Sequence, residues 1–216
     1  AALAVALAAA EAAQQRAAQL GAHLLHAALD IMDDVDDAAD DGPRHRRRWL
    51  QADWAADLDP MGNARLDGEA SIRNQTGDRH VYDVRAAFKL DPVIMNASAV
   101  GGNVRVTLEM DANGGALDVP AGASVWSVML DEDEVKRLHP GPFMMGGSGS
   151  GNAVADANFG APYPGLAAPS IEEGFQVRHH CRLTSGDRAV FATDLVVGGD
   201  PSDFVRRREV ERPVRV

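Results

Sequence analysis

The apolar residues of this 216-residue chain follow two different patterns, and the change between them lies near Gly68. Before this point alanine dominates and no proline occurs from Ala1 to Ala39, which favours a helix because alanine has the highest intrinsic helix propensity. After it, short runs of β-branched and aromatic residues are separated by Gly, Pro, Asn and Asp, a pattern typical of strands and turns. The sequence therefore predicts an α+β protein, helical at its N-terminus and β-rich beyond.

Two helices are predicted before the β-rich region. The first is a long, alanine-rich amphipathic helix over residues 1–41, ended by Asp41-Gly42-Pro43. The second is shorter and covers 46–57, within a linker over 42–69. The small side chains on the first helix suit close packing against another helix or a sheet. Apolar residues mark the two buried stripes: Leu20, Leu24, Ala28, Ile31, Val35 and Ala38, then Trp49, Leu50 and Trp54.

The remaining residues, 70–216, are predicted to form an antiparallel β-sandwich or a partly open barrel. Several short strands follow one another there without intervening helices, which is typical of these architectures. Val104, Val106 and Leu108 alternate with polar residues, as in a strand with one buried face and one wet face. Trp126 is predicted to anchor the core, because large aromatic side chains supply much of the burial in a small domain.

Turns and loops of this domain are also predicted. Asn113-Gly114 indicates a tight turn between two strands. Residues 174–183 and 188–197 are predicted to be strands of one hairpin, joined by Thr-Ser-Gly-Asp. Residues 138–170 are rich in Gly and Pro and predict one loop, which is long by ordinary loop statistics.

Charge and cysteine content narrow the classes of partner. Lys and Arg total 21 against 32 Asp and Glu, so the chain carries a net charge of -11 and nucleic acid is an unlikely partner. Cys181 is the single cysteine, so no disulfide can form within the chain. The apolar run Ala1 to Ala10 is too short to span a bilayer, and no membrane span is predicted. No compartment is indicated.

The first residue is not methionine, so the natural N-terminus is expected to be cut or processed. Two interpretations of the apolar start remain open. It is either the plain beginning of an alanine-rich helix, or the remnant of a signal peptide or of a longer apolar helix.

Aspartates crowd the end of the first predicted helix, with seven between Asp30 and Asp41. Among them Asp33, Asp34 and Asp37 are spaced so that a helix brings their carboxylates to one side, one turn apart. Such a group binds Mg²⁺ when a diphosphate supplies further ligands, which makes these three the candidate metal site. The alternative is a solvated acidic helix end, or one paired with the chain's own Arg44 to Arg48.

With His26 upstream and Arg46 to Arg48 downstream, this Asp-Asp-x-x-Asp stretch resembles the first aspartate-rich motif of trans-isoprenyl diphosphate synthases. The resemblance implies binding of a magnesium diphosphate, an all-helical fold and a second aspartate-rich motif on another helix. The chain after Gly68 instead has the pattern of strands and loops, so the family signature is not carried over.

A second group of candidate ligands lies on one predicted strand. His179 and Cys181 are expected on one face of it and His180 on the other. Two ligands are too few for zinc, although sulfur and imidazole from a nearby loop would suit copper. The alternative is an ordinary strand cysteine flanked by histidines. The loop residues considered for this role are His139, Met144 and Met145.

Three further features are weak signals. The glycine-rich run 146–151 lacks the lysine of a phosphate-binding P-loop. Ser148 and Ser150 lack the strand-to-helix elbow of a hydrolase nucleophile. His23 and His26 have a spacing that would allow joint ligation on a helix, but such histidines more often border a packed stripe.

No convincing catalytic set emerges, so the chain is expected to be a structural or assembly protein without enzymatic activity. Its N-terminal helix would pack against partner copies, giving self-association. Two alternatives stay open. One is a metal- or ligand-binding β-domain, and the other is a Mg²⁺-dependent enzyme that acts on a phosphorylated substrate through Asp33, Asp34 and Asp37. No cofactor is expected beyond a possible divalent cation.

Overall fold

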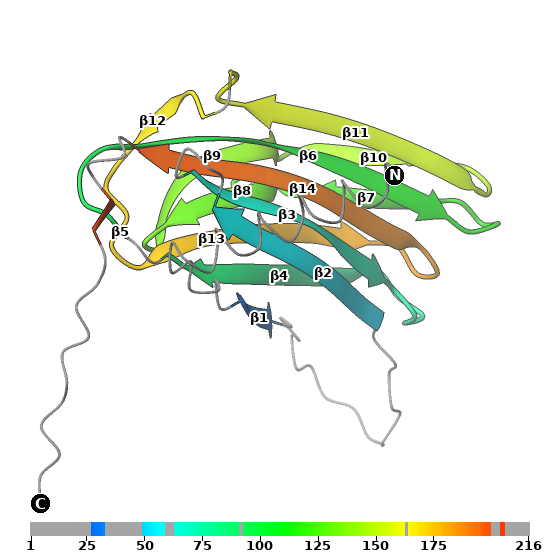
Figure 1. Ribbon diagram of the computed structural model, residues 1–216. Coiled ribbons are helices and arrows are strands. Elements are labelled where there is room, and N and C mark those ends of the chain that lie inside the picture. Colours follow the sequence, from blue (N-terminus) through cyan, green and yellow to red (C-terminus); the bar gives the residue numbers. More distant parts are fainter. Residues whose placement is uncertain are drawn as a thin grey trace, which may run out of the picture.

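The computed structural model describes residues 27–32, 49–58, 63–90, 93–162, 164–199 and 204–205. These residues form an all-β, antiparallel sandwich of two large sheets and one short two-stranded sheet (Figure 1). No helix among them is long and apolar enough to cross a membrane. The β-sandwich predicted from the sequence is thus confirmed, while residues 1–26 of the predicted first helix lie outside the described residues.

One sheet, called sheet A, has seven strands. In it β13 pairs with β4 on one side and with β8 and β7 on the other, and β1, β9 and β10 lie at the edges. Its strands are β1 (Ala27–Met32), β4 (His80–Lys89), β7 (Gly115–Val119), β8 (Ser124–Leu130), β9 (Asp133–Pro140), β10 (Phe143–Gly147) and β13 (Gly174–Leu183).

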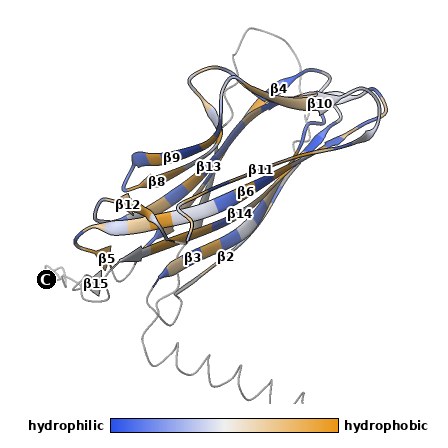
Figure 2. Ribbon diagram, turned by 90° about the horizontal axis from the view of Figure 1, so that it is seen from above, coloured by the Kyte–Doolittle hydropathy of each residue, from blue (hydrophilic) through white to orange (hydrophobic). Residues whose placement is uncertain are grey.

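The other, sheet B, has six strands in the order β11-β6-β14-β3-β2, with β12 also paired to β6. Figure 2 shows the two sheets as separate layers, with β8, β9 and β13 in one and β6, β14, β3 and β2 in the other. The strands of sheet B are β2 (Trp49–Leu58), β3 (Ala64–Arg73), β6 (Ser98–Met110), β11 (Gly151–Phe159), β12 (Leu166–Ala168) and β14 (Arg188–Gly199). The short third sheet pairs β5 (Val93–Ile94) with β15 (Phe204–Val205).

The core lies between the layers and is built from alternate residues of each strand. Val104, Val106 and Leu108 are all buried and their polar neighbours are not, as the alternation predicts. Trp126 is fully buried and contacts Phe159, so its predicted role as a core anchor is confirmed.

The predicted short helix over 46–57 is wrong over residues 49–57, because these lie in β2, which pairs with β3 along its whole length. Residues 46–48 lie outside the described residues. Ala52, Trp54 and Ala56 are half-buried against the core, whereas Gln51 and Asp53 are exposed. This is the period of two that a strand requires. The pattern was obscured because its inward positions hold alanine, which also favours helices.

Residues 27–32 lie within the segment predicted to be the long N-terminal helix and form β1 at the edge of sheet A. The rest of that segment lies outside the described residues, so the helix itself stays a prediction. The register pairs Ala27 with Phe88 and Met32 with Asp83. Partner strand β4 thus overrides the local helix propensity of this segment, as tertiary pairing commonly does.

The single loop predicted over 138–170 is wrong as well. This region contains the end of β9 and all of β10, β11 and β12. Edge strand β11 pairs with nine residues of β6 and places small alanines inward, whereas its outward positions are polar except for Val154. A strand with alanine on its inner face shows little alternation of large apolar and polar residues. The prediction therefore followed the glycines and prolines of 138–170, which indicate a loop.

The predicted hairpin of β13 and β14 is wrong in its pairing, although both strands exist. Strand β13 belongs to sheet A and β14 to sheet B, so the Thr184–Asp187 turn crosses from one layer to the other. The turn at Asn113-Gly114 is confirmed, with the Gly114 N–H donating to the Asp111 carbonyl. It also crosses between layers, from β6 to β7.

Candidate functional site

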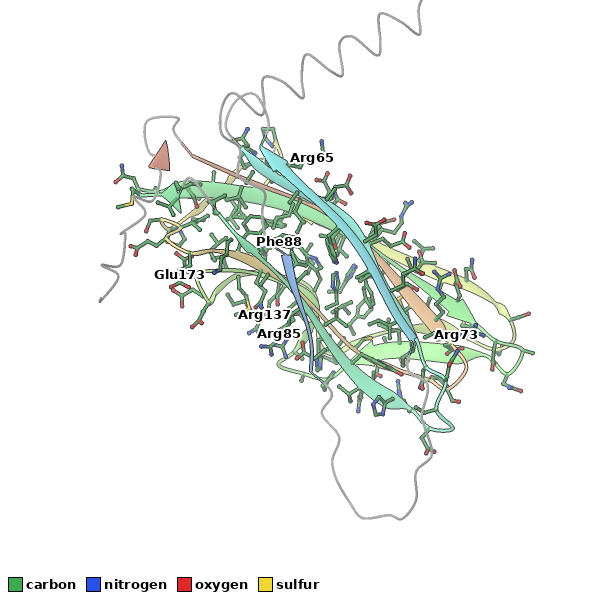
Figure 3. All side chains as sticks on the ribbon, turned by 60° about the horizontal axis from the view of Figure 1, so that its bottom comes forward. Arg65, Arg73, Arg85, Phe88, Arg137 and Glu173 are labelled. Carbon is green, nitrogen blue, oxygen red and sulfur yellow. The ribbon has the colours of Figure 1, made fainter. Side chains whose placement is uncertain are left out.

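An open groove of about 440 Å³ lies at one end of sheet B. It is found where β3 and β6 end and β14 begins. In Figure 3 Arg73 marks this end of β3, and Arg65 marks the other end. The groove is lined by Arg73, Gln75, Glu109, Met110, Asp111, Gly186 and Arg188.

The sheet register brings the charged groups of the groove together. Arg188 on β14 lies opposite Arg73 on β3 and opposite Glu109 on β6, so the three side chains share one outward row. The Arg188 Nη1 atom is 3.2 Å from both carboxylate oxygens of Glu109, and Nε donates to the Ser71 hydroxyl at 2.7 Å. Arg188 is therefore fixed in position by two neighbouring strands.

Hydrogen bonds between two loops hold the end of the groove in place. Asn74 is fully buried, and its side-chain amide donates to the carbonyls of Asp78 and Leu183, both at 2.8 Å. The Gly186 N–H donates in turn to the Asn74 carbonyl at 2.8 Å. These bonds tie the β3–β4 loop to the β13–β14 turn, so Gln75 and Gly186 are presented from a braced framework.

Asp187 supports, from inside the protein, the wall of the groove that contains Asp111. Its side chain is fully buried, and its Oδ1 accepts from the Asp111 N–H at 3.1 Å. Burial raises the pKa of this carboxyl above its ordinary value. Its carboxylate packs against the Cα of Gly115, where any Cβ would overlap it, so glycine is required at that position. Asp187 supports the wall without lining the groove.

Two of the lining side chains have no hydrogen-bond or ion-pair partner within the described part of the chain, namely Arg73 and Gln75. Both residues are exposed. Across from them, Asp111 accepts from the Asn113 N–H at 2.7 Å and Glu109 is held by Arg188. The groove thus offers unsatisfied donors beside fixed carboxylate acceptors.

The lining contains no histidine, cysteine, serine or threonine that would act as a nucleophile or a general base. No group of three or more metal-ligating side chains lies within the residues that the structure describes. The arrangement can therefore hold a polar ligand by hydrogen bonds, with the Met110 side chain supplying a small apolar surface.

The candidate metal ligands Asp33, Asp34 and Asp37 lie outside the described residues, as do His23 and His26. The Mg²⁺ site therefore stays a prediction.

The histidines and the cysteine of β13 lie on the faces of the strand that were predicted for them. His179 and Cys181 are fully buried, and His180 is half-buried on the other face. Burial lowers the pKa of His179 to about 3, and burial, with a smaller effect of Asp118, raises the pKa of Cys181 to about 12. His179 contacts Trp54, Phe191 and Thr193. These are core side chains, so a buried strand cysteine is the interpretation that the structure supports.

The loop residues considered as further ligands, and the glycine-rich run, lie on β9, on β10 and in the turn after β10. His139 contacts Phe143, and burial lowers the pKa of its imidazole. Met144 is 76% exposed on β10. The glycine-rich run 146–151 spans the end of β10, a turn at 148–150 that contains Ser148 and Ser150, and the first residue of β11.

Sequence reasoning missed the groove. Arg73, Glu109 and Arg188 are far apart along the chain and are adjacent only through the pairing of three strands. The single available signal was positional, because Glu109 and Arg188 stand near the ends of predicted strands, whereas no strand was predicted at Arg73. The turns that connect strands lie together at the two ends of a sandwich, and ligand sites are common there.

The chain matches no family model and no curated protein. Among solved structures it is similar to TmCBM61 in complex with β-1,4-galactotriose, with 8% identity over 71% of this chain and 88% of that one, and a TM-score of 0.25. The family 11 carbohydrate-binding module of the cellulase Lic26A-Cel5E of Clostridium thermocellum gives 9% identity, coverage of 82% and 90%, and a TM-score of 0.24. A structure of infectious bursal disease virus, Gx strain, gives 14% identity over 82% of this chain and 39% of that one, with a TM-score of 0.30. Similarity this distant carries no argument about function.

Proposed function

We propose that this chain is a binding domain without catalytic activity, which holds a small, neutral ligand rich in hydroxyl groups, such as a saccharide, in the groove at the end of sheet B. The observation that supports this most directly is the unpartnered pair Arg73 and Gln75, facing carboxylates that are already held in place.

The balance of charge in the groove favours a neutral ligand. Arg73 and Arg188 disfavour a cation, and Glu109 and Asp111 disfavour an anion. A guanidinium can only donate hydrogen bonds and a carboxylate can only accept them. A pair of neighbouring hydroxyl groups accepts from the first and donates to the second, so a saccharide satisfies both kinds of group at once.

The two carboxylates give no support to a hydrolytic role. Glu109 is bound by Arg188 and Asp111 accepts from the Asn113 N–H, so both carboxyl groups already act as hydrogen-bond acceptors. A glycosidase needs one of its two carboxyl groups to be a protonated acid. Incubation with saccharides should therefore leave them intact, and release of reducing ends would contradict the proposal.

Calorimetric titration of matched arginine variants tests the binding. Arg73→Ala should weaken binding of cellobiose, maltose or lactose by roughly tenfold, because a charged hydrogen bond contributes on the order of 1.5 kcal/mol. Arg65→Ala is the control, since Arg65 lies on the same strand and the same face but at the other end, paired with Asp194. Equal loss in both variants, or no heat with any of the sugars, would reject the proposal. Heat with the zwitterion glutamine alone would assign the groove to another ligand class.

The predicted assembly through the N-terminal helix stays a prediction, because most of that segment lies outside the described residues. The same holds for the alternative of a divalent cation at Asp33, Asp34 and Asp37.

A further inference from the structure

The outer face of sheet A carries a row of arginines. Arg137 on β9 lies opposite Ser127 on β8, which lies opposite Arg178 on β13, which lies opposite Arg85 on β4. Strands are about 4.8 Å apart, so the row spans roughly 14 Å across the sheet. The three arginines are part-exposed, with side-chain exposures between 29% and 49%, whereas Ser127 is buried.

Carboxylates on the same face neutralise only part of this charge. Asp83 accepts from both Arg178 and Arg85, and these arginines hold its pKa below the ordinary value although burial alone would raise it. Asp118 is shared in the same way by Arg79 and Arg182, and Glu134 pairs with Arg137. Among the side chains that the structure describes on this face, five arginines thus face three carboxylates. Each guanidinium has five N–H donors, more than one carboxylate can accept.

The outer face of sheet B carries the opposite charge near its β2 edge. Asp53 on β2 lies directly opposite Glu69 on β3, and Asp67 follows on the same face of β3. All three are exposed, and none has an ion-pair partner among the residues covered by the structure. Like charges placed directly opposite each other destabilise a sheet, so this acidic patch would be stabilised by an external cationic group.

We propose that the arginine row of one copy docks on the acidic patch of a second copy, so that sandwiches associate face to face, sheet A against sheet B. Arginine suits this contact because its planar guanidinium binds a carboxylate through two parallel hydrogen bonds. Asp53 and Glu69 meet across neighbouring strands, so one copy presents two carboxylates together to the arginine row of the next.

The geometry of this contact is head to tail. The two faces lie on opposite layers of the same chain, so each copy keeps one face free after docking, and the contact propagates as an open series unless it closes into a ring. Five strands about 4.8 Å apart and roughly 25 Å long give a face on the order of 600 Å². That is at the low end for specific interfaces, so the pair is weak and forms only at high protein concentration.

Added salt should first strengthen the association between copies and then, at high concentration, weaken it. The net charge of -11 makes whole copies repel one another at very low ionic strength. At about 0.1 M the Debye length of roughly 10 Å screens that repulsion more than it screens touching ion pairs, and near 1 M the ion pairs weaken too. Association should therefore be greatest at an intermediate ionic strength.

Sedimentation of the full chain and of two face variants tests the proposal. Arg85→Gln with Arg137→Gln weakens the arginine row while leaving Arg178 on Asp83, and Asp53→Asn with Glu69→Gln weakens the acidic patch. Each double variant alone should sediment as a monomer where the unaltered chain forms dimers and larger species. Mixed one to one, the two variants should form a dimer that grows no further, because only one intact row and one intact patch can meet.

The control is Arg105→Gln, which also removes a positive charge but from the β6–β11 part of sheet B, and it should associate as the unaltered chain does. Thermal unfolding of all variants checks that they remain folded. The proposal is overturned if the unaltered chain is monomeric at every ionic strength tested. It is also overturned if the mixture stays monomeric, or if the face variants associate as strongly as the unaltered chain.

Discussion

His179 is the residue whose surroundings most depart from those its chemistry prefers. Its imidazole is fully buried, and it lies among the rings of Trp54 and Phe191. Its Nε2 atom is 3.2 Å from the Thr193 hydroxyl. Burial lowers the pKa of the imidazole from 6.5 to about 3, because no charged partner compensates the lost hydration of the protonated ring. The folded chain therefore holds this histidine neutral at pH values where an unfolded chain would protonate it.

Acid should destabilise the fold through His179. Below the unfolded pKa of 6.5 the unfolded state binds a proton that the folded state does not. As the pH is lowered from 6.5, the free energy of unfolding should therefore fall by about 1.4 kcal/mol for each pH unit, until the pH nears 3. His179→Phe should remove this slope whatever it does to stability at neutral pH, as measured by urea unfolding at several pH values. His180→Gln, on the next residue and the other face, should keep it, and an unchanged slope in His179→Phe would refute the assignment.

At the scale of elements, strands with conventional hydrophobic alternation were predictable and strands lined with alanine were not. Val104, Val106 and Leu108 identified β6 because large β-branched and aliphatic side chains fill its inner face. Strands β2 and β11 have alanine at most of those inward positions, so helix propensity or turn signals outweighed their period of two. Pairing of β13 with β4 rather than β14 was not predictable, since turn residues do not reveal whether a chain stays in one sheet or crosses to the other.

Edge strand β2 depends on Trp54 covering a glycine. Gly68 on β3 lies opposite Trp54, and a Cβ at Gly68 would overlap the Trp54 ring and approach the Asp53 carbonyl to 2.7 Å. Gly68→Ala should therefore displace the ring and lower the free energy of unfolding by about 1–3 kcal/mol in urea unfolding. Gly77→Ala is the control, because a Cβ there meets nothing within 4 Å. Equal stability of the two variants would show that Trp54 does not cover Gly68.

For the whole molecule, the β-sandwich followed from the sequence, but the distribution of strands between its two layers and the groove did not. A sandwich follows from strands without helices, whereas Arg73, Glu109 and Arg188 converge through register, which depends on the core of both sheets together. The aspartate run was the most conspicuous local motif. The groove has no local motif, because its polar groups come from three separate strands.

Self-association through the N-terminal segment is a separate prediction at this scale. Leu24→Asp with Ile31→Asp should reduce oligomers in size-exclusion chromatography if packing of the predicted helix forms them. Ile31 lies in β1 and is paired with Val84, so Leu24→Asp alone is the cleaner variant. A chain that elutes as a monomer before mutation, at up to about 1 mM, would contradict both this prediction and the face-to-face contact.

The most direct test of the proposed binding function is an NMR titration that follows the arginine Nε–Hε signals. Cellobiose, maltose and lactose would each be added up to ~50 mM, a range that detects affinities near 1 mM. Binding in the groove predicts that the signals of Arg73 and Arg188 shift along one saturating curve with at least one sugar, while those of Arg65 and Arg105 stay in place. Signals of Arg73 and Arg188 that remain unmoved by all three sugars, or that move no more than those of Arg65 and Arg105, would contradict the account.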